Sequence, residues 1–307
     1  MTATLDVLTD EVIMNLAGYT LQQDRTTHLT SNITTTTSTL ATPTTFSLNA
    51  DEIGSGTIEI NDELLWVDSY DRISKTATIP PYGRGFMGTT ATTHNAGDRV
   101  VISPTFPRSS VKRSIQDTIR AIGSSIYAAK NTSFIYSPST DVYEFENLNV
   151  QNVLRMSWQD TGSTKRWVPI TRFTFEPSPD AATFSANSQT VTINDRFIQA
   201  GRKVNVTYAT APSTLSTSST DSFADQTGLS ESVRDVVVLG ASYRLLSFLD
   251  PARNAITSPQ ADEIDSKRQY GSGNAATRAL YQLYASRLAE EVQAQQQQYP
   301  PRIRYSR

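Results

Sequence analysis

Histidine and cysteine side chains make most zinc sites and many catalytic nucleophiles, and this chain of 307 residues has few of them. It contains no cysteine, and its only two histidines are His28 and His94. Protein zinc sites commonly use several His or Cys ligands, and no two histidines share the spacing of one helical face. We therefore expect no bound metal and no cofactor. We expect His94 to make a local hydrogen bond inside its loop.

The glycine-rich segment 83–88, Gly-Arg-Gly-Phe-Met-Gly, invites comparison with phosphate-binding and RNA-binding motifs. A phosphate-binding loop needs a lysine followed by serine or threonine, and none comes after it. In the RNA-binding motif, a small residue stands where this chain has Met87, and a second aromatic residue follows. A structural role is a better explanation than phosphate or RNA binding: the glycines permit positive φ at tight turns, and the Phe86 side chain packs at the base of a sheet.

Serine and carboxylate patterns do not predict an enzyme. The Gly-x-Ser-x-Gly sequence of the hydrolase nucleophile elbow is absent, since the Gly-Ser-Gly strings at 54–56 and 271–273 lack its spacing. Paired carboxylates occur, for example at 144 and 146 and at 290–291, without the spacing of a calcium loop. Solvated surface charge explains these pairs better than catalysis does.

The charge balance and the distribution of apolar residues limit the partners. A net charge of -3 argues against broad electrostatic attraction to nucleic acid, which needs clustered lysine and arginine. The first residues lack the basic start and apolar run of a secretory signal. No segment approaches the roughly 20 apolar residues that span a bilayer. We expect a protein made in a cytoplasm, with no membrane partner.

Four segments predict α-helices. Apolar residues recur every three or four positions in residues 4–19, 109–129 and 275–297, which gives each of them one apolar face. Residues 230–249 are apolar on nearly every side, with Ser230 as a possible cap, so we expect that helix to be buried all round. Because all four helices need partners, we expect them to pack as a single bundle.

Two β-rich segments lie between these helices. In residues 26–106, apolar alternation predicts a hairpin with Asn61-Asp62 as its turn. In residues 131–210, five short strand-like runs separated by turn signals favour an antiparallel sandwich or a small barrel. The expected fold class is α+β, with a four-helix bundle, two inserted antiparallel β-units and an extended C-terminal tail.

These elements divide the chain into six parts. They are an N-terminal bundle helix (1–25), an inserted β-unit (26–106), a second bundle helix (107–130), an inserted sandwich or barrel (131–210), a linker with two bundle helices (211–298) and the tail (299–307).

The tail alternates basic with aromatic or apolar side chains, and Pro300-Pro301 keeps it extended. Two interpretations remain open. It is a frayed terminus, the default for chain ends, or an anchor that adds as a strand or threads into a groove on a partner protein. Arginine and aromatic residues are typical of binding anchors. The candidate anchor residues are Tyr299, Arg302, Ile303, Arg304, Tyr305 and Arg307.

Residues 84–98 resemble a motif of tailed-bacteriophage virion proteins. The motif consists of arginine, glycine, a large apolar residue, glycine, threonine, small residues, a histidine and a closing glycine. The matching residues here are Arg84, Gly85, Phe86, Gly88, Thr89, His94 and Gly97, about a twentieth of the chain. The resemblance implies a structural part of a virus particle and no enzyme.

The wider plan resembles the head-to-tail connector, or adaptor, of long-tailed phages. Members of that family have a small helical bundle, form a ring of twelve copies under the portal protein and reach upward with an extended C-terminal segment. The resemblance implies that residues 299–307 bind the portal. This chain departs from the family, whose members are mostly helical and considerably shorter, because two β-units make up about half of its length.

On this hypothesis the function is mechanical. A ring in the neck of the virion seals the portal exit, offers a platform to tail or neck proteins and lets DNA pass without sequence-specific binding. Acidic walls repel phosphate and reduce sticking.

Three alternatives remain. One is a minor tail, baseplate, neck or capsid-associated protein with a β-rich binding module. A carbohydrate-binding tip protein would use exposed aromatic residues such as Trp66, Trp158 and Trp167. A cell-wall hydrolase would need a carboxylate or metal centre that the sequence does not display.

Overall fold

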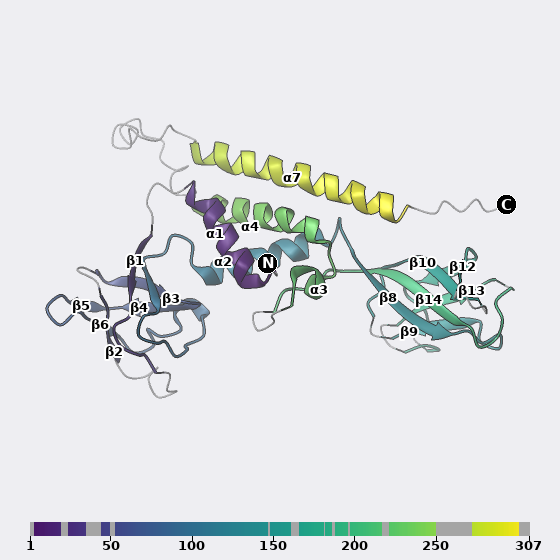
Figure 1. The fold of residues 1–307 in the computed structure, drawn as a ribbon, viewed down its shortest axis with the longest axis horizontal. Coiled ribbons are helices and arrows are strands. Elements are labelled where there is room, and N and C mark those ends of the chain that lie inside the picture. Colours follow the sequence, from purple (N-terminus) through teal and green to yellow (C-terminus); the bar gives the residue numbers. More distant parts are fainter. Residues whose placement is uncertain are drawn as a thin grey trace. The chain divides into compact units, whose positions relative to one another are not determined.

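The computed structural model contains five α-helices and four antiparallel β-sheets among the residues that it describes (Figure 1). The described residues are 3–19, 24–34, 44–49, 53–146, 148–160, 166–180, 182–185, 188–195, 197–216, 221–249 and 272–300.

The first β-unit is formed by two antiparallel sheets. One sheet has the strand order β1-β7-β3-β4, and the other has the order β2-β6-β5. The predicted hairpin is confirmed, because β3 pairs with β4 around a turn in which Asn61 takes a φ of 54°. The strands are β1 (Arg25–His28), β2 (Thr44–Ser47), β3 (Gly56–Ile60), β4 (Glu63–Val67), β5 (Ser69–Asp71), β6 (Thr76–Ile79) and β7 (Arg99–Ile102).

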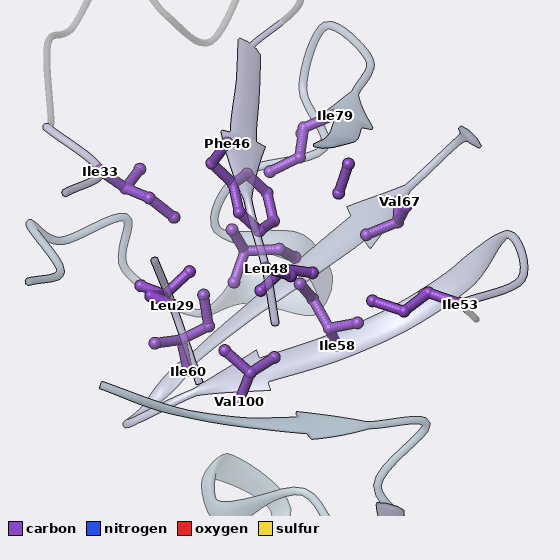
Figure 2. Close-up of a cluster of buried hydrophobic side chains, with 12 residues drawn as sticks. Leu29, Ile33, Phe46, Leu48, Ile53, Ile58, Ile60, Val67, Ile79 and Val100 are labelled. Atoms are coloured by element: carbon purple, nitrogen blue, oxygen red, sulfur yellow. The ribbon is translucent and has the colours of Figure 1, made fainter. Parts of the chain in front are cut away.

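Side chains from both sheets fill the core of this β-unit. Phe46 of β2 and Ile79 of β6 meet Ile58 of β3 and Val100 of β7 (Figure 2). All four side chains are buried. Burying an aliphatic or aromatic side chain of this size stabilises a fold by about 1.5–3 kcal/mol, so this core fixes where the ends of β4 and its neighbouring loops lie.

The second β-unit also consists of two antiparallel sheets, with strand orders β11-β10-β14-β8 and β12-β13-β9. The strand-like runs from residue 153 onward are confirmed, whereas β8 and β9 have no counterpart in the sequence prediction. The strands are β8 (Ala128–Ile135), β9 (Val142–Phe145), β10 (Asn152–Gln159), β11 (Trp167–Pro169), β12 (Phe173–Glu176), β13 (Gln189–Ile193) and β14 (Lys203–Thr210).

Helices form in all four predicted segments. They are α1 (Leu5–Ala17), α2 (Arg108–Ile122), α4 (Arg234–Leu249) and α7 (Ser272–Gln298), and a short helix, α3 (Phe223–Thr227), precedes α4. Helix α2 is shorter than predicted, because the chain turns at Gly123 and then enters β8. None of the described helices is both long and apolar enough to cross a membrane.

The predicted four-helix bundle is wrong, although the α+β class broadly fits. The chain divides into two compact units. One unit comprises Met1–Leu5, Gln116–Val237 and Gln282–Arg307, and the other comprises Asp6–Ile115 and Val238–Tyr281. Each unit combines one β-unit with helical segments. The physical reason is clearest in α7, where Leu283 of the predicted apolar stripe is 54% exposed although Leu280 and Tyr284 of the same stripe are buried. Periodicity predicts that a helix has an apolar stripe, but it does not determine whether other helices cover that stripe.

Candidate functional site

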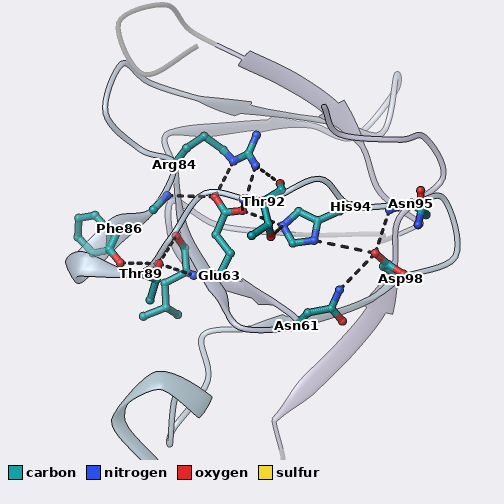
Figure 3. Close-up of polar contacts among 11 residues, drawn as sticks. Asn61, Glu63, Arg84, Phe86, Thr89, Thr92, His94, Asn95 and Asp98 are labelled. Carbon is teal, nitrogen blue, oxygen red and sulfur yellow. Dashed lines mark hydrogen bonds and ion pairs between the residues drawn. The ribbon is translucent and has the colours of Figure 1, made fainter. Parts of the chain in front are cut away.

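The motif residue Arg84 is buried, and a carboxylate from the neighbouring hairpin holds it. Arg84 lies in the loop after β6, and Glu63 is the first residue of β4. The guanidinium is 1% exposed and the carboxylate is fully buried. Arg84 Nε donates to Glu63 Oε1 at 2.6 Å, and Nη2 donates to Oε2 at 2.9 Å (Figure 3). Two such parallel bonds fix the orientation of both groups.

Three more groups of the motif loop donate to the same carboxylate. The backbone N–H of Gly85 lies 3.0 Å from Oε1, and that of Thr92 lies 2.9 Å from Oε2. The Nε2 atom of His94 is 2.8 Å from Oε2, and it carries the proton because an ionised carboxylate only accepts. We call Glu63, Arg84, Gly85, Thr92 and His94 the Glu63 brace.

Further bonds close the loop around the Glu63 brace. Arg84 Nη2 also donates to the carbonyl oxygen of Thr92 at 2.6 Å. Thr89 Oγ1 accepts from the backbone N–H of Leu64 at 3.0 Å and donates to the carbonyl oxygen of Phe86 at 3.0 Å. The half-buried Phe86 ring packs beside Trp66 of β4, with ring centroids 5.4 Å apart. Both ends of the glycine-rich loop are therefore tied to β4.

His94 reaches farther than the sequence suggested. The expected local contact is present, since Nε2 of the ring lies 3.5 Å from Thr92 Oγ1. The shorter hydrogen bond, at 2.8 Å, joins the ring to Glu63, which lies 31 positions earlier in the chain. Its backbone pairs with Ile33 through two hydrogen bonds of 2.8 and 2.9 Å. The N–H of Gly97 donates to the carbonyl oxygen of Leu29 at 2.8 Å. The second half of the motif thus joins the loop to the chain that follows β1.

The environment of Glu63 keeps its carboxylate ionised. Burial alone would raise its pKa, but the hydrogen bonds from His94, Arg84 and Thr92 outweigh burial and lower the pKa from 4.5 to about 2. With Arg84 positive and Glu63 negative, the ion pair itself carries no net charge.

This arrangement holds a loop and offers no reactive group to a substrate. The side chains of Glu63, Arg84 and His94 are at most 1% exposed. A group that no substrate can touch does not act as a general acid, base or nucleophile. Elsewhere in the described part of the chain, no group of three or more His, Asp or Glu residues is placed to hold a metal ion.

The brace predicts that the two motif glycines differ in their tolerance of a side chain. Gly85 has a φ of 61°, and an added Cβ would lie 2.8 Å from the carbonyl oxygen of Thr89. Gly88 has a φ of 82° and open space around it. We expect Gly85→Ala to destabilise the β-unit by roughly 3 kcal/mol and Gly88→Ala by roughly 1 kcal/mol, since only the first adds a clash to backbone strain. Urea unfolding measures both, and equal losses would contradict this account.

A second buried carboxylate lies on β3, close to the start of α2. Glu59 is 3% exposed, and its Oε1 accepts the backbone N–H of Arg108 at 2.6 Å. Burial raises its pKa from 4.5 to about 7 against the opposing effect of Arg108. Nearby, Lys112 Nζ bonds to Asp62 and lies 2.7 Å from Asp6, and Arg108 pairs with Asp62. Glu59 is therefore mainly neutral below pH 7 and ionises as the pH rises through 7, while charged pairs lie nearby.

The other predicted site residues are scattered or lie outside the described residues. Tyr299 follows α7, and its ring centroid is 6.4 Å from that of Tyr127. Trp66 and Trp167 are 36% and 40% exposed, whereas Trp158 is buried. The remaining predicted anchor residues, Arg302, Ile303, Arg304, Tyr305 and Arg307, lie outside the described residues.

Sequence reasoning missed Glu63, the residue on which the brace depends. A usable signal was present. Arg84 lies in a loop rich in glycine and apolar residues, where a buried guanidinium needs a carboxylate. Glu63 stands at the start of the neighbouring predicted strand. Its place in a polar Asn-Asp-Glu turn made it look like ordinary surface charge.

No protein-family model and no curated protein matches this chain.

Proposed function

We propose that this chain is a structural protein of a tailed-bacteriophage virion, and that it acts as a head-to-tail connector in the neck region. The observation that carries the proposal is the Glu63 brace. Four of the residues that carry the resemblance to virion proteins form hydrogen bonds to β4. Arg84, Gly85 and His94 bond to Glu63, and Thr89 bonds to the backbone of Leu64.

This observation supports a structural role for the motif. A resemblance that rested on exposed residues would point to a shared ligand. Here it rests on side chains and backbone groups that position a loop against β4, which points to a shared way of building a β-unit. A virion protein needs such rigidity because it works by holding its neighbours in place.

In the proposed role the protein forms a homo-oligomeric ring between the portal and the tail or neck proteins. Residues 299–307 bind the portal, with arginines pairing to carboxylates and aromatic side chains filling pockets. DNA passes through the ring without sequence-specific contacts, in keeping with the net charge of -3. Chemistry on a substrate has no part in this function.

Assembly with the portal protein encoded in the same genome tests the proposal. We expect electron microscopy of the purified protein mixed with portal to reveal rings attached to it. A variant ending at Pro300 is expected to lose attachment, whereas a variant with Asp68→Asn, an exposed change, keeps it. Monomers alone, with and without portal, would contradict a connector. Unchanged attachment of the truncated variant would contradict the anchor.

One observation favours the second candidate, a minor tail, baseplate or neck protein with a β-rich binding module. Tyr82 and Met87 both take positive φ, at 64° and 55°, and their side chains are 72% and 76% exposed. Large side chains in this conformation are uncommon and mark sites where the surrounding structure imposes strain. The loop that the brace holds thus presents Tyr82 and Met87 to solvent, as a binding loop does. Binding of tail or baseplate proteins that Tyr82→Ser with Met87→Ser abolishes would support this candidate.

A further inference from the structure

A cavity of about 370 Å³ lies between the end of α7, the start of β8 and the segment that joins α3 to α4. All of its lining residues belong to the same compact unit of the chain. Its volume falls in the range of small-ligand sites, which is about 300–1,000 Å³. A side chain of another molecule or a small ligand therefore fits inside it.

One side-chain amide holds two walls of this cavity together. Gln295 of α7 donates from Nε2 to the carbonyl oxygen of Tyr127 at 2.7 Å, and its Oε1 accepts the Tyr127 N–H at 3.2 Å. Tyr127 directly precedes β8, so these bonds hold the end of α7 against the start of that strand. The cavity is therefore preformed, and a ligand binds without the cost of assembling it.

Glu291 supplies a negative charge that is largely shielded from solvent. Its side chain is 11% exposed, and its Oε2 accepts a hydrogen bond from the hydroxyl of Ser232 at 2.7 Å. Both residues line the cavity. The Oε1 atom of Glu291 accepts from Arg287 Nη2 at 3.2 Å. An ionised carboxylate accepts about four hydrogen bonds, so the bonds from the described residues leave acceptor positions for a ligand.

Arg287 does not neutralise Glu291, because it serves three carboxylates. It also pairs with Glu290, and its Nη2 lies 4.0 Å from Asp235. Three acidic groups around one guanidinium leave an excess of negative charge. Glu290 and Asp235 are 58% and 72% exposed, so water and salt screen their charges. The charge of Glu291 is screened much less, and it therefore attracts a cation into the cavity.

The rest of the cavity offers aromatic and apolar surface. Tyr127 and Tyr299 both line it, with ring centroids 6.4 Å apart and ring planes tilted by 53°. Ile126, Leu229 and Val233 also line it, and each is at most 3% exposed. The alkyl stem of a basic side chain lies along surface of this kind while its charged head reaches a polar group.

The charged and aromatic residues follow one face of α7. Glu291, Gln295 and Tyr299 are spaced by four residues, which places them one above another. The helical turn continues as far as Tyr299, whose N–H bonds to the carbonyl oxygen of Gln295 at 2.9 Å. Two turns, or about 12 Å along the axis, separate Glu291 from Tyr299. This layout suits an elongated ligand with a positive charge at one end.

We propose that this cavity binds an alkyl guanidinium group. The guanidinium donates to Glu291, and its alkyl chain lies against the buried apolar residues and the tyrosine rings. A guanidinium suits the site better than an ammonium, because its donors lie in one plane that matches a carboxylate and because it is more weakly hydrated.

The group has two sources, an arginine side chain of a partner protein and a free small molecule. Binding of either goes beyond the proposed function, because the cavity lies within a single chain and includes none of residues 301–307.

Isothermal titration calorimetry of the full chain with n-butylguanidinium tests the proposal. We expect saturable binding with a dissociation constant on the order of 1 mM, which is typical of so small a ligand. The neutral n-butylurea has nearly the same shape and no charge. We expect it to bind at least about tenfold more weakly, because it lacks the charge-assisted hydrogen bonds to Glu291.

Three variants connect the binding to this cavity. Glu291→Gln is expected to weaken binding at least about tenfold. Glu290→Gln is the matched control, because it makes the same charge change beside the same Arg287 outside the cavity, and we expect a change below about twofold. Ala294 lines the cavity, so Ala294→Leu is expected to abolish binding by filling it without altering any charge. Circular dichroism checks that each variant folds.

Several results would overturn the proposal. They are a titration without saturation at about ten times the expected constant, equal binding of n-butylurea, and unchanged binding by folded Glu291→Gln or Ala294→Leu. A capped peptide with one arginine between alanines distinguishes the two sources. Tighter binding of the peptide than of n-butylguanidinium would assign the cavity to an arginine of a partner protein, and weaker binding would assign it to a free small molecule.

Discussion

Replacing Glu63 by glutamine is expected to destabilise the first β-unit by about 3–5 kcal/mol at pH 7, the usual loss when one partner of a buried ion pair is removed. The variant leaves the Arg84 guanidinium buried with no carboxylate. It also turns the amide nitrogen of glutamine toward N–H groups that need an acceptor. The pKa of about 2 implies a similar magnitude, about 3 kcal/mol.

Urea unfolding of the variant and the original chain measures this loss. Asp68→Asn, which removes an exposed carboxylate on the same β-unit, is the matched control and is expected to change stability by less than about 0.5 kcal/mol. Combining Glu63→Gln with Arg84→Met removes both charges and is expected to recover part of the loss. A loss below about 1 kcal/mol for Glu63→Gln would show that the brace does not hold the loop.

Replacing Glu59 by glutamine is expected to stabilise the same unit by about 3 kcal/mol at pH 8 and to change little below pH 4.5. The pKa of Glu59 is raised in the folded state to about 7. Its contribution to stability is therefore fully present below 4.5, its ordinary pKa, and is lost as the pH rises through 7. Glutamine imitates the neutral acid at every pH, and its carbonyl oxygen can still accept the N–H of Arg108.

Denaturation curves between pH 4 and pH 8 measure this effect. The difference in unfolding free energy between the Glu59→Gln variant and the original chain is expected to grow across that range. The exposed Glu176→Gln serves as the control, with no such trend. The signature is distinct from that of Glu63, whose contribution is present above pH 4.5 and is lost as the pH falls through 2. A constant difference would contradict the assignment to Glu59.

The elements of the fold were predictable where one periodicity dominates. The stripe of Val111, Ile115, Ile119 and Ile122 predicted α2, and all four side chains are fully buried. The alternation around Asn61 predicted the hairpin of β3 and β4. Strand β8 was not predictable, because a helical period that continues to Ile126 masks its start and its later residues are largely polar.

The arrangement of those elements was much less predictable. An apolar stripe identifies a buried face without naming what covers it, and this is why the bundle was wrong. The motif loop posed the same difficulty at smaller scale, since glycine spacing predicted its turns but the partner of Arg84 and His94 lies on another strand. A contact across 31 positions leaves no local pattern in the sequence.

Glu63 also affects the order in which the first β-unit can form. The β3–β4 hairpin is local, whereas Arg84 and His94 reach Glu63 only after two further strands and a long loop have come into place. Until then, burial of Glu63 would trap a negative charge without any donor, so the early hairpin must keep that end of β4 hydrated. The transition state for folding is therefore expected to contain the hairpin without the brace, and substitutions in the brace should accelerate unfolding more than they slow folding.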